Sequence, residues 1–99
     1  EFASSILNHA SFYKMKLKKA LFYGCTLHEA DFTECDLTET VFDKCDLYRA
    51  VFKNSILKKV DFTTAANYSI DPENNTMEKA RFALSGVQGL LEKYSIIIE

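Results

Sequence analysis

Large apolar residues recur at every fifth position over the first two thirds of the chain. Every tenth residue from Phe2 to Phe62 is phenylalanine, and every residue midway between two of these is leucine. An α-helix repeats every 3.6 residues and a strand every two, so neither keeps these side chains on one buried face. The period therefore predicts a supersecondary repeat that stacks in space. We expect the structural core to consist of Phe12, Leu17, Phe22, Leu27, Phe32, Leu37, Phe42, Leu47, Phe52, Leu57, Phe62 and Phe82.

The position two residues before each large residue usually carries a small side chain, and Met15 is the one large exception. Each unit thus reads small-x-large-x-x, as in Ala30–Glu34 and Cys35–Glu39. Units of this form keep their register up to Phe62 and resemble those of the pentapeptide-repeat family. The resemblance is specific because consecutive units share this pattern over most of the chain.

The resemblance implies an all-β solenoid, namely a right-handed quadrilateral parallel β-helix of about four coils. Each five-residue unit would form one side, and residues twenty apart would lie above one another at about 4.8 Å, the spacing of paired strands. We expect the β-helix to span residues 1–82. Its last coil, residues 63–82, is degenerate, because turn-forming residues replace the pattern around Asp71-Pro72 and Asn74-Asn75.

The segment 83–99 has a different pattern and is predicted to form a cap and a dimerisation element. Ser85 and Gln88 have the spacing of a capping box, and an apolar stripe follows at helical spacing, which predicts a short α-helix over about 86–94. Three isoleucines then predict a terminal strand. This ending is similar to those of bacterial gyrase-interacting pentapeptide-repeat proteins, in which the corresponding region makes a twofold dimer. The expected interface residues are Val87, Leu90, Leu91, Tyr94, Ile96, Ile97 and Ile98.

The chain begins at Glu1-Phe2, already inside a repeat unit, with no polar segment or helix to cover the first coil. The ends of solenoids expose unpaired backbone and apolar rings unless they are capped. We therefore expect the chain to be a piece of a longer repeat protein. The alternative is that another copy packs on this end.

Charge and cysteine usage favour a soluble, cytoplasmic protein. The net charge is -2, which gives no bulk attraction to nucleic acid or to an anionic membrane, and neither a membrane span nor a signal peptide is expected. The cysteines Cys25, Cys35 and Cys45 occupy small inward positions. A disulfide between Cys25 and Cys45 is conceivable because they would stack, but reduced core cysteines are the favoured interpretation.

The sign of the charge alternates from coil to coil. Lysines dominate residues 1–20 and 41–60, whereas residues 21–40 carry only acids and residues 61–80 mostly acids. Stacked coils would then pair opposite charges and disfavour a slip by one layer. The pairs expected from the spacing are Lys14 with Glu34, Lys19 with Glu39, Glu39 with Lys59, and Glu29 with Arg49.

The sequence contains no pattern of catalytic or metal-binding residues. His9 and His28 would lie on one side in adjacent coils, but no third ligand has a reliable spacing, so an exposed pair without function is favoured over a metal site. Tyr13, Tyr23 and Tyr48 would lie on three different sides and so do not form a stacking platform for nucleic acid. We expect no enzymatic activity, no cofactor, no metal and no direct nucleic-acid binding.

Two functions are therefore weighed. The first is a non-enzymatic scaffold or protein-interaction module whose partner the sequence does not identify. The second, which the resemblance alone implies, is a DNA-mimic-like binder of DNA gyrase or topoisomerase that confers quinolone protection. Such mimicry needs an acidic surface. One side of the expected β-helix departs from this requirement because it carries Lys16, Lys18, Lys19, Lys58 and Lys59.

Overall fold

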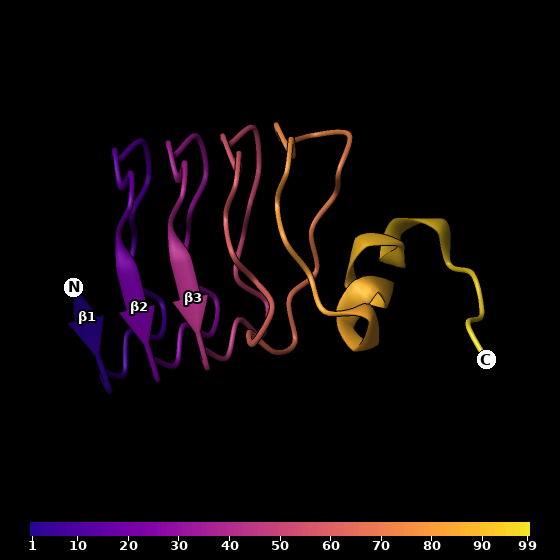
Figure 1. Ribbon diagram of the computed structural model, residues 1–99, viewed down its shortest axis with the longest axis horizontal. Helices are drawn as coiled ribbons and strands as arrows, with labels where there is room; N and C mark the ends of the chain where they lie inside the picture. Colours follow the sequence, from indigo (N-terminus) through magenta and orange to yellow (C-terminus); the bar gives the residue numbers. More distant parts are fainter.

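The computed structural model describes residues 1–99 and stacks segments that lie twenty residues apart in the sequence (Figure 1). Strands β1 (Phe2–Ala3), β2 (Leu21–Tyr23) and β3 (Val41–Asp43) form a parallel sheet in the order β1-β2-β3. The chain is therefore a β-helix solenoid with parallel pairing between coils. Single bridges continue the pairing in four columns: Ile6–Thr26–Asp46–Ala66, Ser11–Asp31–Val51, Lys16–Asp36–Ile56–Thr76, and Val41–Asp61–Arg81.

The backbone bonds between coils have the pattern of a parallel ladder. The Leu27 N–H donates to the Asp46 carbonyl (2.9 Å), and the Asp46 N–H donates to the Cys25 carbonyl (3.0 Å). A residue in the left-handed region ends every five-residue unit up to Lys59 and turns the chain, which explains the period of five. These corner residues, with φ between +54° and +64°, are His9, Lys14, Lys19, Gly24, Glu29, Glu34, Glu39, Lys44, Arg49, Asn54, Lys59 and Lys79.

Two columns of phenyl rings fill the core. Phe42 stacks on Phe22 with ring centroids 5.1 Å apart, and Phe52 stacks on Phe32 at the same distance. The columns meet edge to face, as Phe22 and Phe32 do at an interplanar angle of 89°, which is a favourable arrangement of aromatic quadrupoles. The residues expected in the core are all buried except Leu17 and Phe82, which are half-buried and pack against it.

The small inward positions have a second role that the sequence pattern did not reveal. From the second coil onward, a hydroxyl or thiol at this position donates a hydrogen bond to a carbonyl group of the preceding coil. Thr40 Oγ1 donates to Leu17 (2.6 Å), Ser55 Oγ to Phe32 (2.5 Å), and Cys45 Sγ to Phe22 (3.2 Å). Small residues are thus required here for space, and a hydroxyl or thiol additionally satisfies a buried acceptor.

All three cysteines are free and buried, in agreement with the expectation of reduced core thiols. Burial raises the pKa of the Cys35 thiol and raises that of Cys45 to about 11. Because the thiolate is the reactive form, we expect iodoacetamide at mildly alkaline pH to leave the cysteines of the folded chain unlabelled and to label them in urea. Mass spectrometry checks this, and equal labelling rates in the two conditions would contradict the buried ladder.

The last coil leaves the stack on one side, as the degenerate pattern predicts. Ala66, Thr76 and Arg81 still pair with the coil before them, but no bridge joins Val51 to Asp71. The segment between Ala66 and Thr76, residues 67–75, lies away from the stack and toward the C-terminal helices (Figure 1), and we call it the bulge. Tyr68 and Ile70 are buried there, and the Ile70 N–H donates to the Gly89 carbonyl (2.9 Å).

The predicted C-terminal α-helix is wrong in type. The chain forms two 3-10 helices, η1 (Leu84–Leu90) and η2 (Glu92–Tyr94), and no side-chain cap forms at the start of η1. Residues three apart eclipse one another in a 3-10 helix. This geometry places Gly86 and Gly89 on one edge, and both lie directly against Tyr68.

The predicted terminal strand does not form either. Residues 96–98 pair with no other segment and are exposed. Ser95 has a left-handed conformation (φ 52°) and directs the chain away from the stack, so no sheet edge is within its reach. Figure 1 shows this segment extending beyond the helices.

None of the four expected ion pairs forms. Pairs occur instead between Lys18 and Asp36 (3.6 Å) and between Lys58 and Glu78 (3.7 Å). The remaining pairs are His9–Glu29, His28–Asp46, Asp61–Arg81, Asp71–Lys93 and Glu73–Lys93. Exposed pairs of long side chains contribute little free energy, so adjacency of two Cα atoms does not determine which side chains meet.

Candidate functional site: the groove between the last coils and the C-terminal helices

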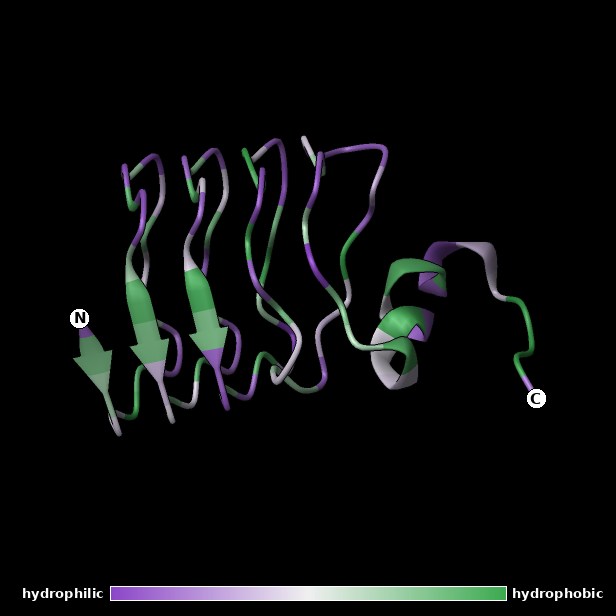
Figure 2. Cartoon of the chain, viewed as in Figure 1, coloured by the Kyte–Doolittle hydropathy of each residue, from purple (hydrophilic) through white to green (hydrophobic).

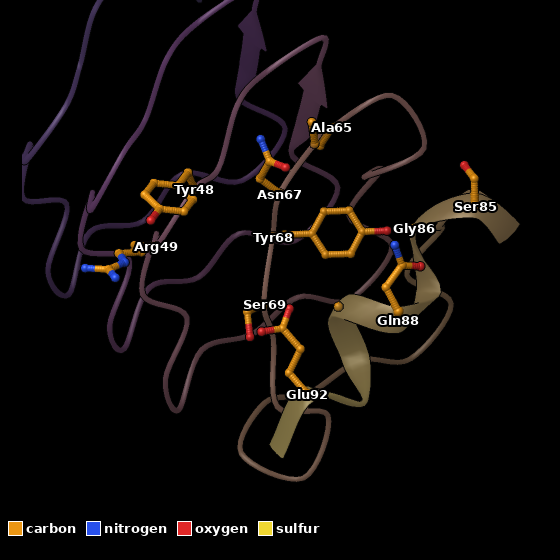
Figure 3. Close-up of a pocket in the computed structure, with 12 residues that line it drawn as sticks. Tyr48, Arg49, Ala65, Asn67, Tyr68, Ser69, Ser85, Gly86, Gln88 and Glu92 are labelled. Carbon is orange, nitrogen blue, oxygen red and sulfur yellow. The ribbon is translucent and has the colours of Figure 1, made fainter. Parts of the chain in front are cut away.

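The bulge in the last coil brings Tyr68 under the C-terminal helices. Its ring lies 5.6 Å from the Phe62 ring and 5.5 Å from the Phe82 ring, and thus closes the end of a phenyl column. The hydroxyl points toward Gly86 in Figure 3 and has no hydrogen-bond partner. The buried site raises the pKa of Tyr68, because the charged phenolate would lose its hydration there.

A groove of about 640 Å³ lies beside this tyrosine, between the last coils and helices η1 and η2 (Figure 3). Its lining is mostly polar. The charged and amide groups come from different elements: Arg49 from a corner, Asn67 from the bulge, Gln88 from η1 and Glu92 from η2. Neither Arg49 nor Glu92 forms an ion pair.

A hydrogen-bond network lies next to the groove and is centred on Asp46. Its carboxylate accepts hydrogen bonds from His28 Nε2 (2.7 Å), Asn67 Nδ2 (3.0 Å) and the Tyr48 N–H (3.1 Å). Burial alone raises the pKa of this carboxyl, but the donors from Asn67, His28 and Tyr48 outweigh it, so the pKa lies below the ordinary value of 3.8. The network therefore depends on an ionised Asp46.

A carboxyl whose pKa is depressed by folding stabilises the folded state above its unfolded-state pKa, and this contribution is lost as the pH falls through the folded-state pKa. We therefore expect the urea midpoint to fall as the pH is lowered from 5 through the ordinary value of 3.8. Asp36 and Asp61, whose pKa values are also lowered, act in the same direction. The variant Asp46→Asn should be less stable at neutral pH and should show a shallower acid dependence. Identical acid dependence in the two proteins would contradict the role of Asp46.

Lys93 attaches helix η2 to the bulge. Its ammonium lies 3.0 Å from Asp71 Oδ1 and also contacts Glu73, whose carboxylate accepts a further bond from Tyr94 Oη (3.3 Å). The hydrogen bonds from Lys93 lower the pKa of both acids, and the acids raise the pKa of Lys93. The bulge and the helices are thus joined by charge as well as by Tyr68.

The two histidines do not meet a common set of ligands. His9 pairs with Glu29 (3.8 Å), while His28 belongs to the Asp46 network and contacts the Tyr48 ring edge to face at 5.6 Å. No group of three histidine, cysteine or acidic side chains is arranged to hold a metal ion.

The residues expected at a dimer interface fall into two groups. Val87, Leu90 and Leu91 are half-buried, and Leu90 packs against the core. Tyr94 and residues 96–98 are exposed. Sequence reasoning missed Leu84, which is 88% exposed. Leu84 lies three residues before Val87 and seven before Leu91, so the helical spacing of apolar residues, continued before residue 86, was the signal that could have found it.

A family model describing pentapeptide repeats matches the chain in eight copies, over residues 5–43 and 30–65. These two ranges together cover more than half of the sequence. The chain belongs to the pentapeptide-repeat family.

Solved structures of other pentapeptide-repeat proteins are similar to this chain. QnrB1, a plasmid-mediated fluoroquinolone resistance protein, matches at 18% identity with a TM-score of 0.44, covering 95% of this chain and 43% of that one. A pentapeptide-repeat protein from the thylakoid lumen of Arabidopsis thaliana matches at 16% identity with a TM-score of 0.34, covering 78% and 61%. Rfr23 from the cyanobacterium Cyanothece 51142 matches at 14% identity with a TM-score of 0.31, covering 85% and 60%. The chain thus spans less than half the length of QnrB1. No curated protein matches the chain.

Proposed function

We propose that this chain is a non-enzymatic protein-interaction module that uses its C-terminal end as a contact surface. The observation that carries the proposal is the group of exposed apolar side chains at that end: Leu84 is 88% and Ile97 is 85% exposed. Ile96, Ile98 and Tyr94 are also exposed, and Figure 2 shows the terminal segment in the colour of hydrophobic residues. Clustered exposed apolar residues of this kind are typical of protein–protein contacts.

We infer that the partner at this end is a second copy of the chain. Residues 96–98 form no backbone hydrogen bond within the chain, so their backbone groups are free to pair with the same segment of another copy around a twofold axis. Burying the isoleucines would supply the apolar area, and the pairing would satisfy the backbone. The expected product is a symmetric homodimer.

Light scattering on the whole chain tests the dimer. The native chain should have twice its monomer mass of 11.3 kDa, and Ile97→Asp should be monomeric because the dimer would bury an unpaired charge. Ile6→Asp is the matched control, since Ile6 is similarly exposed (80%) but lies in the first coil. A monomeric native chain, or a dimer that Ile97→Asp leaves intact, would reject the interface.

We further propose that the coils wind as a right-handed quadrilateral β-helix in a reducing, cytoplasmic compartment. The left-handed corner at each fifth residue up to Lys59 and the four columns of bridges support the four-sided coil. The free, buried thiols fit a reducing compartment. No helix of the chain has the length and apolar character needed to span a membrane.

Gyrase binding as a DNA mimic is the second candidate function. It is favoured by the acid-only coil, residues 21–40, on a rod whose two shorter dimensions are nearly equal (23 and 22 Å). It ranks second because coils containing lysines lie on both sides of this acidic band. Supercoiling by DNA gyrase, measured with and without the chain in the presence of a quinolone, tests it. No effect at micromolar concentration would reject gyrase binding and leave the interaction module intact.

A further inference from the structure

One side of the solenoid differs in charge from the chain as a whole. This basic side comprises residues 16–19, 36–39, 56–59 and 76–79, which the bridges Lys16–Asp36–Ile56–Thr76 align in consecutive coils. It carries six lysines against three acids, a net charge of +3 on a chain of net charge -2. The remainder of the chain must therefore be acidic. The lysines are Lys16, Lys18, Lys19, Lys58, Lys59 and Lys79, and the acids are Asp36, Glu39 and Glu78.

Ion pairs within the basic side neutralise only part of this charge. Lys18 pairs with Asp36 and Lys58 with Glu78. The other four lysines are exposed and have no carboxylate within 4 Å, and Glu39 is the single remaining acid. The unpaired lysines are Lys16, Lys19, Lys59 and Lys79.

The basic side also offers apolar contact. Ile56 is 41% exposed in the middle of it. A groove of about 550 Å³ lies at its edge and has a mixed lining, comprising Met15, Cys35, Ile56 and Asn54, the lysines Lys14 and Lys16, and the acids Glu34 and Asp36. The β-ladder holds the backbones of successive coils about 4.8 Å apart, so the lysine positions are fixed and little backbone entropy is lost when a partner binds. The side thus combines a fixed array of cations with an apolar centre.

We propose that the basic side docks an acidic segment of a protein partner, with carboxylates on the unpaired lysines and an apolar side chain at Ile56. This proposal rests on the proposed role as a protein-interaction module, but it uses a different surface from the C-terminal end. Nucleic acid fits less well, because the binding of single strands usually relies on aromatic side chains on which the bases stack. None of the exposed tyrosines 13, 23 and 48 lies on this side to stack with bases.

NMR titration of the isotopically labelled chain tests the proposal, because weak binding is measurable residue by residue. The probes are a capped decaglutamate peptide and a ten-nucleotide oligothymidylate. Decaglutamate should shift the amides of residues 16–19 and 56–59, and the shifts should weaken between about 20 and about 200 mM salt as charges are screened. The triple variant Lys16→Gln, Lys19→Gln and Lys59→Gln should weaken binding about tenfold.

The matched control is the triple variant Lys44→Gln, Arg49→Gln and Lys53→Gln, which has the same net charge but keeps the basic side and the lining of its groove. It should bind decaglutamate within about twofold of the native chain. Equal weakening in the two triple variants, or shifts spread over the other sides, would overturn the proposal. Tighter binding of oligothymidylate than of decaglutamate would also overturn it, in favour of a nucleic-acid surface. Failure here leaves the light-scattering result for the C-terminal end unaffected, so the two proposals fail separately.

Discussion

Replacing Phe42 by alanine should lower the free energy of unfolding by about 3–5 kcal/mol, the usual cost of deleting a buried phenyl group. Phe42 is fully buried and stacks between Phe22 (5.1 Å) and Phe62 (5.4 Å), with Phe32 and Phe52 at its edges. Its loss interrupts one phenyl column and leaves a cavity that backbone pairing prevents from collapsing. Urea denaturation followed by circular dichroism measures the change.

Two variants serve as controls for this prediction. Phe42→Leu keeps most of the volume and should cost less than about 1.5 kcal/mol. Phe82→Ala removes a half-buried ring at the end of the column, where the aromatic neighbours are Phe62 and Tyr68 alone, and should cost less than Phe42→Ala. A larger loss for Phe82→Ala than for Phe42→Ala would show that the stability resides in the cap rather than in the stacked coils.

Gly89→Ala should detach the C-terminal helices from the bulge. A Cβ at this position would lie 2.3 Å from the Tyr68 carbonyl oxygen and 3.0 Å from its ring, both within the buried contact. The helix must shift, and the hydrogen bond from Ile70 to Gly89 (2.9 Å) is lost with it. Overpacking of this kind costs about 1–3 kcal/mol. Hydrogen exchange should show loss of protection at Ile70, while amides of the stacked coils keep theirs.

Gly24→Ala is the control that separates crowding from backbone conformation. Gly24 has a left-handed φ of 62°, but a Cβ there meets only Ser4 Oγ, at 3.8 Å. Its cost should be that of the conformation, about 1–2 kcal/mol, and the Ile70 amide should stay protected. Unchanged protection at Ile70 in Gly89→Ala would contradict the docking contact.

A second comparison tests the same contact through the tyrosine hydroxyl. A Cβ at Gly86 would lie 2.3 Å from Tyr68 Oη, and this hydroxyl has no hydrogen-bond partner. Tyr68→Phe removes the clashing atom without breaking a hydrogen bond. Gly86→Ala should therefore cost less in the Tyr68→Phe background than in the native chain, as a double-mutant cycle would measure.

The stacked coils could be predicted from the sequence because each unit repeats one local solution. The large residue fills the core, the small residue fits beside it and can bond a carbonyl of the preceding coil, and the left-handed corner turns the chain. The period alone therefore indicates the stack. The capped end could not be predicted in this way. Its geometry depends on a single contact, Tyr68 against Gly86 and Gly89, between segments whose periodicities are unrelated. The apolar stripe therefore indicated an α-helix, whereas the two glycines within it permit close approach of a 3-10 helix to the tyrosine.

The candidate site was predicted only in part for a similar reason. The sequence indicated residues 96–98 as part of a dimer interface, and the structure shows that they are exposed; the interface itself stays a prediction. The groove beside Tyr68 and the Asp46 network need side chains from coils and helices that no repeat relates. Ion pairing was also beyond prediction, since Cα adjacency of Lys19 and Glu39 does not fix where two long, hydrated side chains point.

The alternation of inward and outward positions has an evolutionary consequence. Only the small and large residues of each unit face the interior, as Cys45 and Leu47 do, and the remaining positions contact water. Substitution at those outward sites can therefore change which molecules are recognised while folding free energy stays nearly constant. Selection for a new ligand and selection for a stable chain act on different residues, so descendants of this scaffold can diverge in specificity without losing their architecture.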